Sequence, residues 1–181
     1  MVRVTALSGR MQAGKTTVAK HLIKHHGYER LSFAGPLKHE ILNMGFPEWA
    51  VELKPDWMRR LMQVYGQAWR AVDPDHWVDA LAADLWNIAT MTAGTNIVID
   101  DLRFENEAHF LRRLDPKTFD VELVRVVRIG SQDVTQAIRS DQSETDLDHW
   151  QDWDLIIQAG SGDITSLLQS VERGLGLPLR S

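Results

Sequence analysis

The chain has 181 residues, 44% of them hydrophobic, and a formal net charge of −5. This size and composition suit one domain around a single buried core, and the absence of cysteine excludes disulfides, thiolate zinc sites and cysteine nucleophiles. The acidic balance argues against a general nucleic-acid surface, which needs clustered positive charge. No apolar run is long enough to cross a bilayer, and the first residues begin a strand without a signal-peptide pattern, so we expect a cytoplasmic protein with no membrane partner.

The first predicted strand and helix flank a phosphate-binding pattern. Residues 9–16 read GRMQAGKT and fit GxxxxGK[ST] without a mismatch. An apolar run at 2–7 predicts the strand, and an apolar stripe at helical spacing over 18–23 predicts the helix, which should end at Gly27. Backbone N–H groups of such a loop and the positive end of its helix point at phosphate oxygens. The pattern therefore predicts a nucleoside-triphosphate site.

In this motif the lysine reaches the β and γ phosphates, and the hydroxyl that follows holds Mg²⁺. We therefore expect ATP and Mg²⁺ as cofactors, with Thr16 as one metal ligand. The residues assigned to ATP binding are Gly9, Gln12, Ala13, Gly14, Lys15, Thr16 and Thr17.

The remaining elements continue the alternation of strand and helix. Strands are predicted at 30–33, 96–100, 121–129 and 154–158, and helices from 34 onward and at 56–71, 75–91, 104–114 and 163–173. Residues 45–55 contain a glycine and two prolines and indicate a loop, and the tail 174–178 should fray or pack loosely. This order predicts a three-layer α/β fold with a mainly parallel sheet and ligands at the carboxyl ends of its strands.

Three loops should therefore face one cleft: the phosphate loop, residues 32–38 and residues 100–107. Asp100 and Asp101 end an apolar strand, where a carboxylate of a P-loop protein contacts Mg²⁺ directly or through water. The other interpretation of the pair is N-capping of the helix that follows. Both interpretations stay open, one carboxylate for each, with Asp101 taken as the metal candidate.

Arginines indicate the kind of acceptor. A phosphate acceptor is already an oxyanion, so it needs clamps rather than the base that an alcohol needs. Guanidinium groups match phosphate oxygens in a bidentate manner. Any single arginine is as well explained by surface charge, so the inference rests on the set. Its members are Arg60, Arg70, Arg103, Arg128 and Arg139.

Four segments together resemble the bacteriophage deoxynucleoside monophosphate kinases, along nearly the whole chain. They are residues 9–16, SFAGPLK at 32–38, LMQVYG at 61–66 and IDDLRFENEA at 99–108. Residues 101–107 look like the DxRFxNE signature of that family, and Ser143-Glu144 is similar to the end of its HxSE element. The chain departs from the family pattern at Asp141, where histidine is common, and at Gln158, where asparagine is usual.

The resemblance implies transfer of the γ-phosphate of ATP to a deoxynucleoside 5′-monophosphate, in the host cytoplasm if the chain is of phage origin. It implies one P-loop kinase domain over 1–181, with a helical acceptor-binding insertion at about 34–92 and a lid at about 129–150. Both substrates are small molecules. The oligomeric state stays open, with a homodimer as one option.

Three sets of residues follow. The catalytic candidates are Lys15, Asp101, Arg103, Arg128 and Arg139. The acceptor-binding candidates are Ser32, Phe33, Lys38, Arg60, Gln63, Arg70, Trp77, Asp101, Arg103, Glu107 and Glu144. The metal candidates are Thr16 and Asp101.

Two other functions stay open. One is a P-loop kinase for another small metabolite, such as a phosphorylated acid, because a loop like 34–38 is not unique to nucleotide kinases. The other is a regulatory or motor module that hydrolyses ATP without an acceptor, although nothing in the sequence signals the large partner surface or ring assembly that such modules use.

Further features carry less weight. LKPD at 53–56 resembles the guanine motif of GTPases but follows no strand, so a GTP switch is not expected. His21, His25 and His26 could hold a metal, but no carboxylate ligand lies nearby in sequence, and histidines suit the negative end of a helix. Residues 140–154 hold six acidic groups without lysine or arginine, which indicates a solvated connection or a lid. The helical pair contains Trp57, Trp69, Trp77 and Trp86; most of these rings should be core, with one ring left to stack on a base.

Overall fold

The computed structural model describes residues 1–92, 94–129, 145–160 and 162–180. One parallel sheet lies at its centre, with the strand order β2-β3-β1-β4-β5. Its strands are β1 (Val2–Ser8), β2 (Tyr28–Leu31), β3 (Asn96–Ile99), β4 (Phe119–Ile129) and β5 (Leu155–Gly160). Because β1 lies beside β3 and runs parallel to it, the loops that follow these two strands emerge side by side at the carboxyl edge of the sheet.

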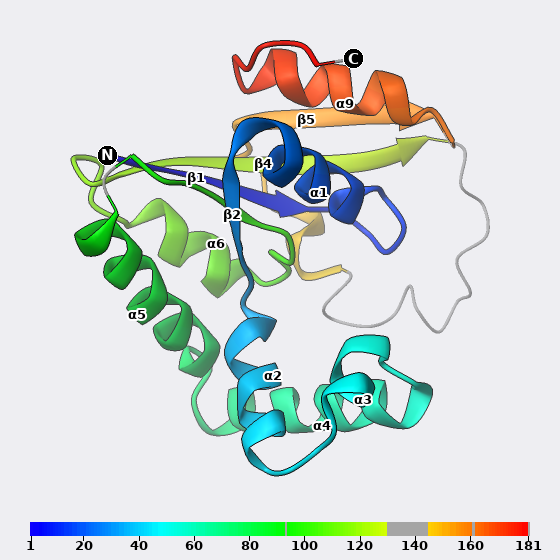
Figure 1. Cartoon of the computed structure of the whole chain (residues 1–181), viewed down its shortest axis with the longest axis vertical. Helices are drawn as coiled ribbons and strands as arrows, with labels where there is room; N and C mark the ends of the chain where they lie inside the picture. The colour runs from blue at the N-terminus through cyan, green and yellow to red at the C-terminus, as the bar shows by residue number, and fades with distance from the viewer. Residues whose placement is uncertain (93, 130–144, 161, 181) are drawn as a thin grey trace.

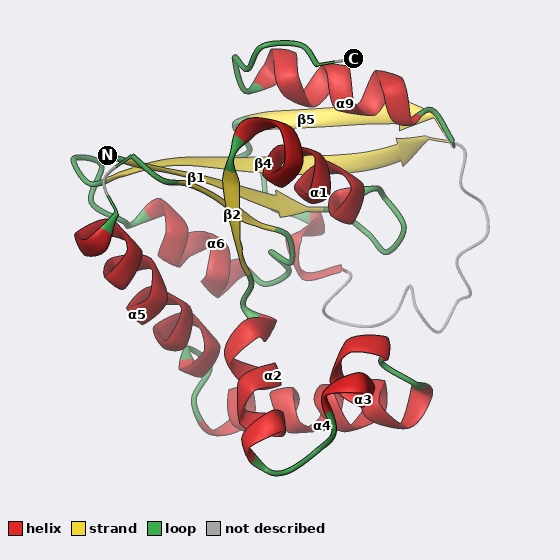
Figure 2. Cartoon of the chain, viewed as in Figure 1, coloured by secondary structure: helices red, strands yellow, loops and turns green. Residues whose placement is uncertain are grey.

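Helices cover both faces of the sheet, which confirms the predicted three-layer α/β fold (Figures 1 and 2). Successive residues of a strand point to opposite faces. Ala6 therefore packs in one core with α5 (His76–Met91) and α6 (Glu105–Arg112), whereas Leu7 packs in the other with α1 (Lys15–His26) and α9 (Ile164–Gly174). Helices on both faces explain why nearly every residue of β1 and β3 is buried.

A group of helices extends from the sheet at the bottom of Figure 1. It consists of α2 (Ala34–Asn43), α3 (Glu48–Leu53) and α4 (Asp56–Val72), which share a small core with the start of α5. The loop predicted at 45–55 is wrong in part, because it contains α3. Pro47 caps the amino end of α3, and Ala50 and Val51 are buried against the neighbouring helices, so the turn residues bracket a helix instead of filling a loop.

The tail from residue 174 is predicted to fray or pack loosely, but residues 174–177 are ordered. The N–H of Leu177 donates to the carbonyl of Glu172 at 2.7 Å, and that of Gly176 donates to the carbonyl of Arg173 at 3.2 Å. With Gly176 at φ +64°, these two bonds form a Schellman motif that ends α9. Leu175 is buried and Leu177 packs against the same core, so apolar contact holds the tail in place.

Residues 130–144, which include the predicted Arg139 and Glu144 and most of the predicted lid, lie outside the described residues. The described part of the predicted acidic segment, residues 145–154, is solvated only in part, with Asp148, Asp152 and Asp154 exposed. Leu147, in the short helix η1 (Asp146–Asp148), is buried in the core that contains α5 and α6. Asp154 pairs with Arg112 of α6 at 2.8 Å, so arginines of other elements neutralise this segment. In the part of the chain that the structure describes, no helix has the length and apolar character needed to span a membrane.

Candidate functional site

The loop between β1 and α1 has the backbone that a phosphate-binding loop requires. Gly9 adopts φ +140°, and a Cβ there would lie 2.2 Å from the carbonyl oxygen of Val126. Gly14 adopts φ +110°, and a Cβ there would lie 2.8 Å from a side-chain carbon of Leu167. Only glycine tolerates such conformations and approaches. The loop therefore lies against β4 and α9, and α1 begins directly after it. In a loop of this kind, the backbone N–H groups and the helix dipole favour binding of an anion.

Lys15 folds back over this loop. Its amino group donates to the carbonyls of Gly9 and Arg10, and its side chain is almost fully buried. Thr16 is exposed in the first turn of α1. The guanidinium of Arg128, near the end of β4, donates to the carbonyl of Gln12 at 3.2 Å. The structure therefore brings the predicted Lys15, Thr16 and Arg128 to the same loop.

Two more arginines stand beside the loop and were missed by the sequence analysis. Arg10 and Arg125 both contact the carboxylate of Asp148, at 2.7 and 2.6 Å. Burial alone would raise the pKa of Asp148, but the hydrogen bonds from these two guanidinium groups outweigh it and lower the pKa. The signal that could have pointed to Arg10 is its position inside the phosphate-binding pattern itself.

Asp100 lies at the carboxyl end of β3, beside the end of β1. One of its carboxylate oxygens is 2.8 Å from the guanidinium of Arg30 in β2. The other, Oδ1, is buried without a hydrogen-bond partner among the described residues. An unpartnered buried carboxylate oxygen is costly unless a donor or a cation satisfies it. This oxygen thus fits a hard cation such as Mg²⁺, which prefers oxygen ligands.

Asp101 has a different role from the metal contact expected for it. Its two oxygens accept the N–H groups of Phe33 at 2.9 Å and Ala34 at 3.0 Å, where α2 begins. Burial raises the pKa of Asp101, although these backbone N–H groups act in the opposite direction. Asp101 therefore caps a helix, as the second interpretation had it, but the helix is α2 of the insertion and not the one that follows.

The side chain of Arg70 and the backbone of Arg103 both contact Glu107. Arg70, on α4, has its guanidinium carbon 4.3 Å from the ring centre of Phe104 and one nitrogen 3.6 Å from the carboxylate of Glu107. That carboxylate also accepts the N–H groups of Arg103 at 2.8 Å and Phe104 at 3.1 Å. Burial first, and then the charge of Asp101, raises the pKa of Glu107 to about 8. The buried carboxyl group of Glu107 thus holds the backbone of Arg103 and Phe104 in place.

Three acceptor-binding predictions do not fit the structure as direct contacts. The side chains of Phe33, Trp77 and Glu107 are buried, with residue exposures of 2%, 1% and 2%, so none presents a surface to a ligand. The Trp77 indole N–H donates to the carbonyl of Gly66 at 3.2 Å, which fixes the ring in the core of the insertion. For Phe33 and Trp77 the physical reason is that large apolar rings gain most from burial in a core.

The other acceptor-binding candidates lie on the surface of the insertion. Arg60 and Gln63 are exposed on α4, and Ser32 and Lys38 are half-buried around the first turns of α2. Lys54, which the sequence analysis dismissed with the GTPase-like motif, caps the carboxyl end of α3 at φ +49°. Its pKa is lowered by burial and then by the positive charges of Lys38 and Arg30. Lys54 therefore adds to a positive environment next to the loop.

No protein-family model matches this chain, and no curated protein does. Among solved structures, a candidate kinase from Chloroflexus aurantiacus j-10-fl is 16% identical, with a TM-score of 0.51 over 96% of each chain. A sugar kinase from Janibacter sp. HTCC2649 is 18% identical, with a TM-score of 0.48 over 97% of this chain and 94% of that one. Shikimate kinase from Acinetobacter baumannii, in complex with shikimate, is 15% identical, with a TM-score of 0.47 over 98% and 95%. At these identities the likeness concerns the fold alone.

Proposed function

We propose that this protein transfers the γ-phosphate of ATP to the phosphate of a deoxynucleoside 5′-monophosphate, giving ADP and the deoxynucleoside diphosphate. One observation carries the choice of acceptor. After β3, the carboxyl groups of Asp101 and Glu107 are both engaged by backbone N–H groups, and Arg70 contacts Glu107. The third carboxylate, Asp100, pairs with Arg30, and its other oxygen is the one that we assign to Mg²⁺. A kinase for alcohols needs a carboxylate aimed at the acceptor hydroxyl. A phosphate acceptor needs cationic clamps, which is the chemistry present here.

The donor side follows from the phosphate loop. Backbone N–H groups of residues 9–14 and the start of α1 would bind the β and γ phosphates, and Lys15 would exchange its bonds to the loop carbonyls for bonds to phosphate oxygens. Thr16 and Asp100 would hold Mg²⁺, which when bound neutralises charge on the β and γ phosphates. Arg128 at the loop would stabilise negative charge as the phosphoryl group moves.

On the acceptor side, Arg70 would bind the monophosphate from α4, and Arg103 would contact the transferring group from the loop after β3. Lys38, Arg60 and Gln63 would line the same side from α2 and α4. In this proposal, residues 34–92 form the acceptor-binding insertion of one domain, and a lid at about 129–150 is anchored at its end by the buried Leu147. Arg139 and Glu144 of that lid lie outside the described residues.

The experiment is to measure ADP formation with ATP and Mg²⁺ against a panel of acceptors. The panel holds the four common deoxynucleoside monophosphates, the matching ribonucleotides, gluconate, shikimate and no acceptor. We expect ADP formation to rise well above the rate without acceptor for at least one deoxynucleoside monophosphate. The rate without acceptor should be low because a kinase excludes water from the γ-phosphate and so suppresses hydrolysis of ATP. Stimulation by an alcohol acceptor alone would favour the small-metabolite kinase, and equal ATP consumption throughout would favour a hydrolytic module.

A further inference from the structure

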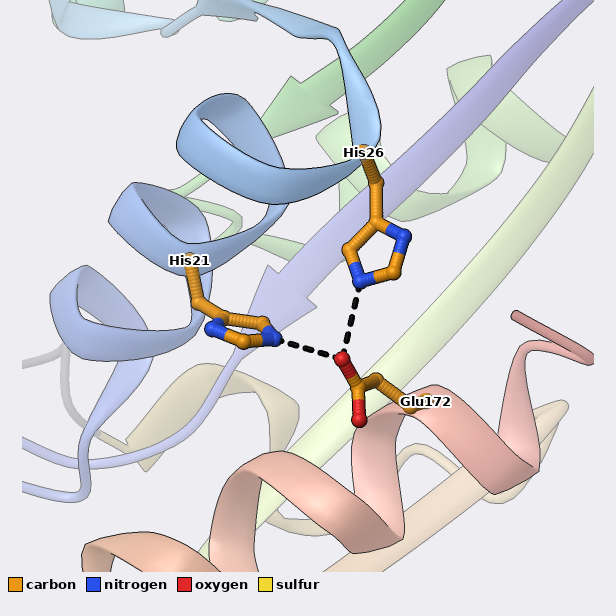
Figure 3. Close-up of side chains that lie close together, drawn as sticks. All are labelled: His21, His26 and Glu172. Carbon is orange, nitrogen blue, oxygen red and sulfur yellow. Dashed lines mark hydrogen bonds and ion pairs between the residues drawn. The ribbon is translucent and has the colours of Figure 1, made fainter. Parts of the chain in front are cut away.

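Three side chains meet between α1 and α9 (Figure 3). His21 and His26 of α1 both direct Nε2 at Oε1 of Glu172 in α9, at 2.8 and 2.9 Å. One potential ligand atom from each residue lies within 4.8 Å of the other two. The sequence analysis discounted the histidines because no carboxylate lay near them in the chain. The fold supplies that carboxylate from 151 residues after His21.

The cluster is buried. The side chain of Glu172 has no exposed surface, and those of His21 and His26 are 8% and 3% exposed. The N–H of Arg180 donates to both oxygens of Glu172 at 3.0 and 3.1 Å, so the tail of the chain closes the cluster from one side. A charged group in such a place must be paired.

The chemistry of this set points to a transition-metal ion. Two neutral imidazoles and one carboxylate are a common ligand set for Zn²⁺, with a water in the fourth position of the tetrahedron. Ligand atoms about 2.0 Å from such an ion lie about 3.3 Å from each other. The nitrogen-to-oxygen distances of 2.8 and 2.9 Å would therefore have to widen by about half an ångström. The two imidazole nitrogens, which lie within 4.8 Å of each other, would have to adjust to the same spacing.

We propose that His21, His26 and Glu172 form a binding site for one divalent transition-metal ion, with zinc the ion that fits best. Each Nε2 would bind the ion through its lone pair, with the ring proton on Nδ1. The ion would replace two N–H···O hydrogen bonds by bonds to both rings and the carboxylate. The site would fasten the helix that starts with Lys15 and Thr16 to α9, at the end of α1 opposite to the phosphate loop.

The test uses the full chain freed of metal with a chelator and without nucleotide. Zn²⁺ is titrated by calorimetry, and Co²⁺ is added to a second sample as a spectroscopic probe of low-coordinate geometry. We expect one ion per chain, visible absorption bands of Co²⁺, and a melting temperature that rises with zinc concentration. His21→Ala and His26→Ala should each weaken zinc binding more than about tenfold. His25→Ala is the matched control, because this ring lies beside that of His21 without contacting Glu172, and it should leave the affinity unchanged.

Equal zinc affinity in His21→Ala and His25→Ala would overturn the proposal, as would the absence of zinc binding to the wild-type chain. If the variants at 21 or 26 do not fold, X-ray absorption of the wild-type zinc complex decides. Two imidazole nitrogens and a carboxylate oxygen around zinc are expected, and a coordination sphere without imidazole would overturn the site. In that case the three side chains are a hydrogen-bonded charge cluster only.

Discussion

The guanidinium of Arg70 lies 3.6 Å from the buried carboxyl group of Glu107, and this contact joins α4 of the insertion to α6. Arg70 also lies over the ring of Phe104, so its plane is fixed from two sides. One terminal nitrogen faces Glu107 and the other donates to the carbonyl of Gly66 at 3.5 Å, which leaves other N–H groups of the guanidinium. In the proposed function, these N–H groups would bind the phosphate of the acceptor.

Replacing Arg70 by alanine is expected to raise the KM for the monophosphate and to change the KM for ATP little. The guanidinium would contact the acceptor in both the ground state and the transition state. Its loss therefore weakens binding of the two states equally, which raises KM and leaves kcat unchanged. Steady-state kinetics with each substrate varied in turn checks this. The control is Arg113→Ala. Arg113 is exposed, and its side chain donates to the carbonyl of His109. An unchanged acceptor KM in Arg70→Ala would show that the residue is assigned wrongly.

Replacing Arg103 by alanine should lower kcat instead. A charge-assisted contact to the transferring group is stronger in the transition state, and its loss costs on the order of 3 kcal/mol of stabilisation. The turnover number at saturating concentrations of both substrates measures this. A kcat equal to that of the wild type would remove Arg103 from the transfer site even if the enzyme is a kinase.

Replacing Lys15 by alanine should abolish nearly all phosphoryl transfer and leave the fold intact. The lysine would contact charge that grows in the transition state, and it now donates to the carbonyls of Gly9 and Arg10 in its own loop. Turnover and the circular dichroism spectrum are compared with those of the wild type. Near-normal transfer by a folded variant is incompatible with a P-loop kinase.

The two neighbouring aspartates should respond differently to replacement by asparagine. Asp100→Asn should raise the Mg²⁺ concentration needed for half-maximal activity, because the unpartnered Oδ1 is the oxygen that fits the cation. Asp101→Asn should instead lower the free energy of unfolding by about 1–2 kcal/mol, since the amide NH2 replaces the oxygen that accepts one of the two backbone N–H groups. Magnesium titrations and urea unfolding of both variants separate the roles. A larger shift of the Mg²⁺ requirement in Asp101→Asn would restore the assignment made from sequence.

Much of this could be predicted from sequence, for a physical reason. The phosphate loop and the alternation of strands and helices are local patterns, and the sheet that they specify is the one observed. What sequence missed depends on partners far along the chain. Asp101 is 68 residues from Phe33, whose N–H it accepts, and its capping role is visible only when α2 is placed beside the end of β3. The ordering of Leu177 likewise comes from tertiary packing, which residue type and spacing do not encode.

The raised pKa of Glu107 predicts a dependence of stability on pH. Its folded pKa of about 8 lies above the ordinary value of 4.5, so the folded state binds the proton more tightly than the unfolded state. The contribution to stability is complete below pH 4.5 and is lost as pH rises through 8. Glu107→Gln keeps a neutral acceptor and should lack this loss. The free energy of unfolding of the variant relative to the wild type should therefore increase between those pH values, and a constant difference would contradict the pKa.

The central claim is that the γ-phosphate of ATP moves to the phosphate of a deoxynucleoside monophosphate. Phosphorus NMR of a reaction with ATP, Mg²⁺ and the acceptor that most stimulates ADP formation tests it directly, because it identifies the product. We predict the signals of a deoxynucleoside diphosphate, growing in step with those of ADP. Signals of ADP with inorganic phosphate, and an unchanged monophosphate, would contradict the account.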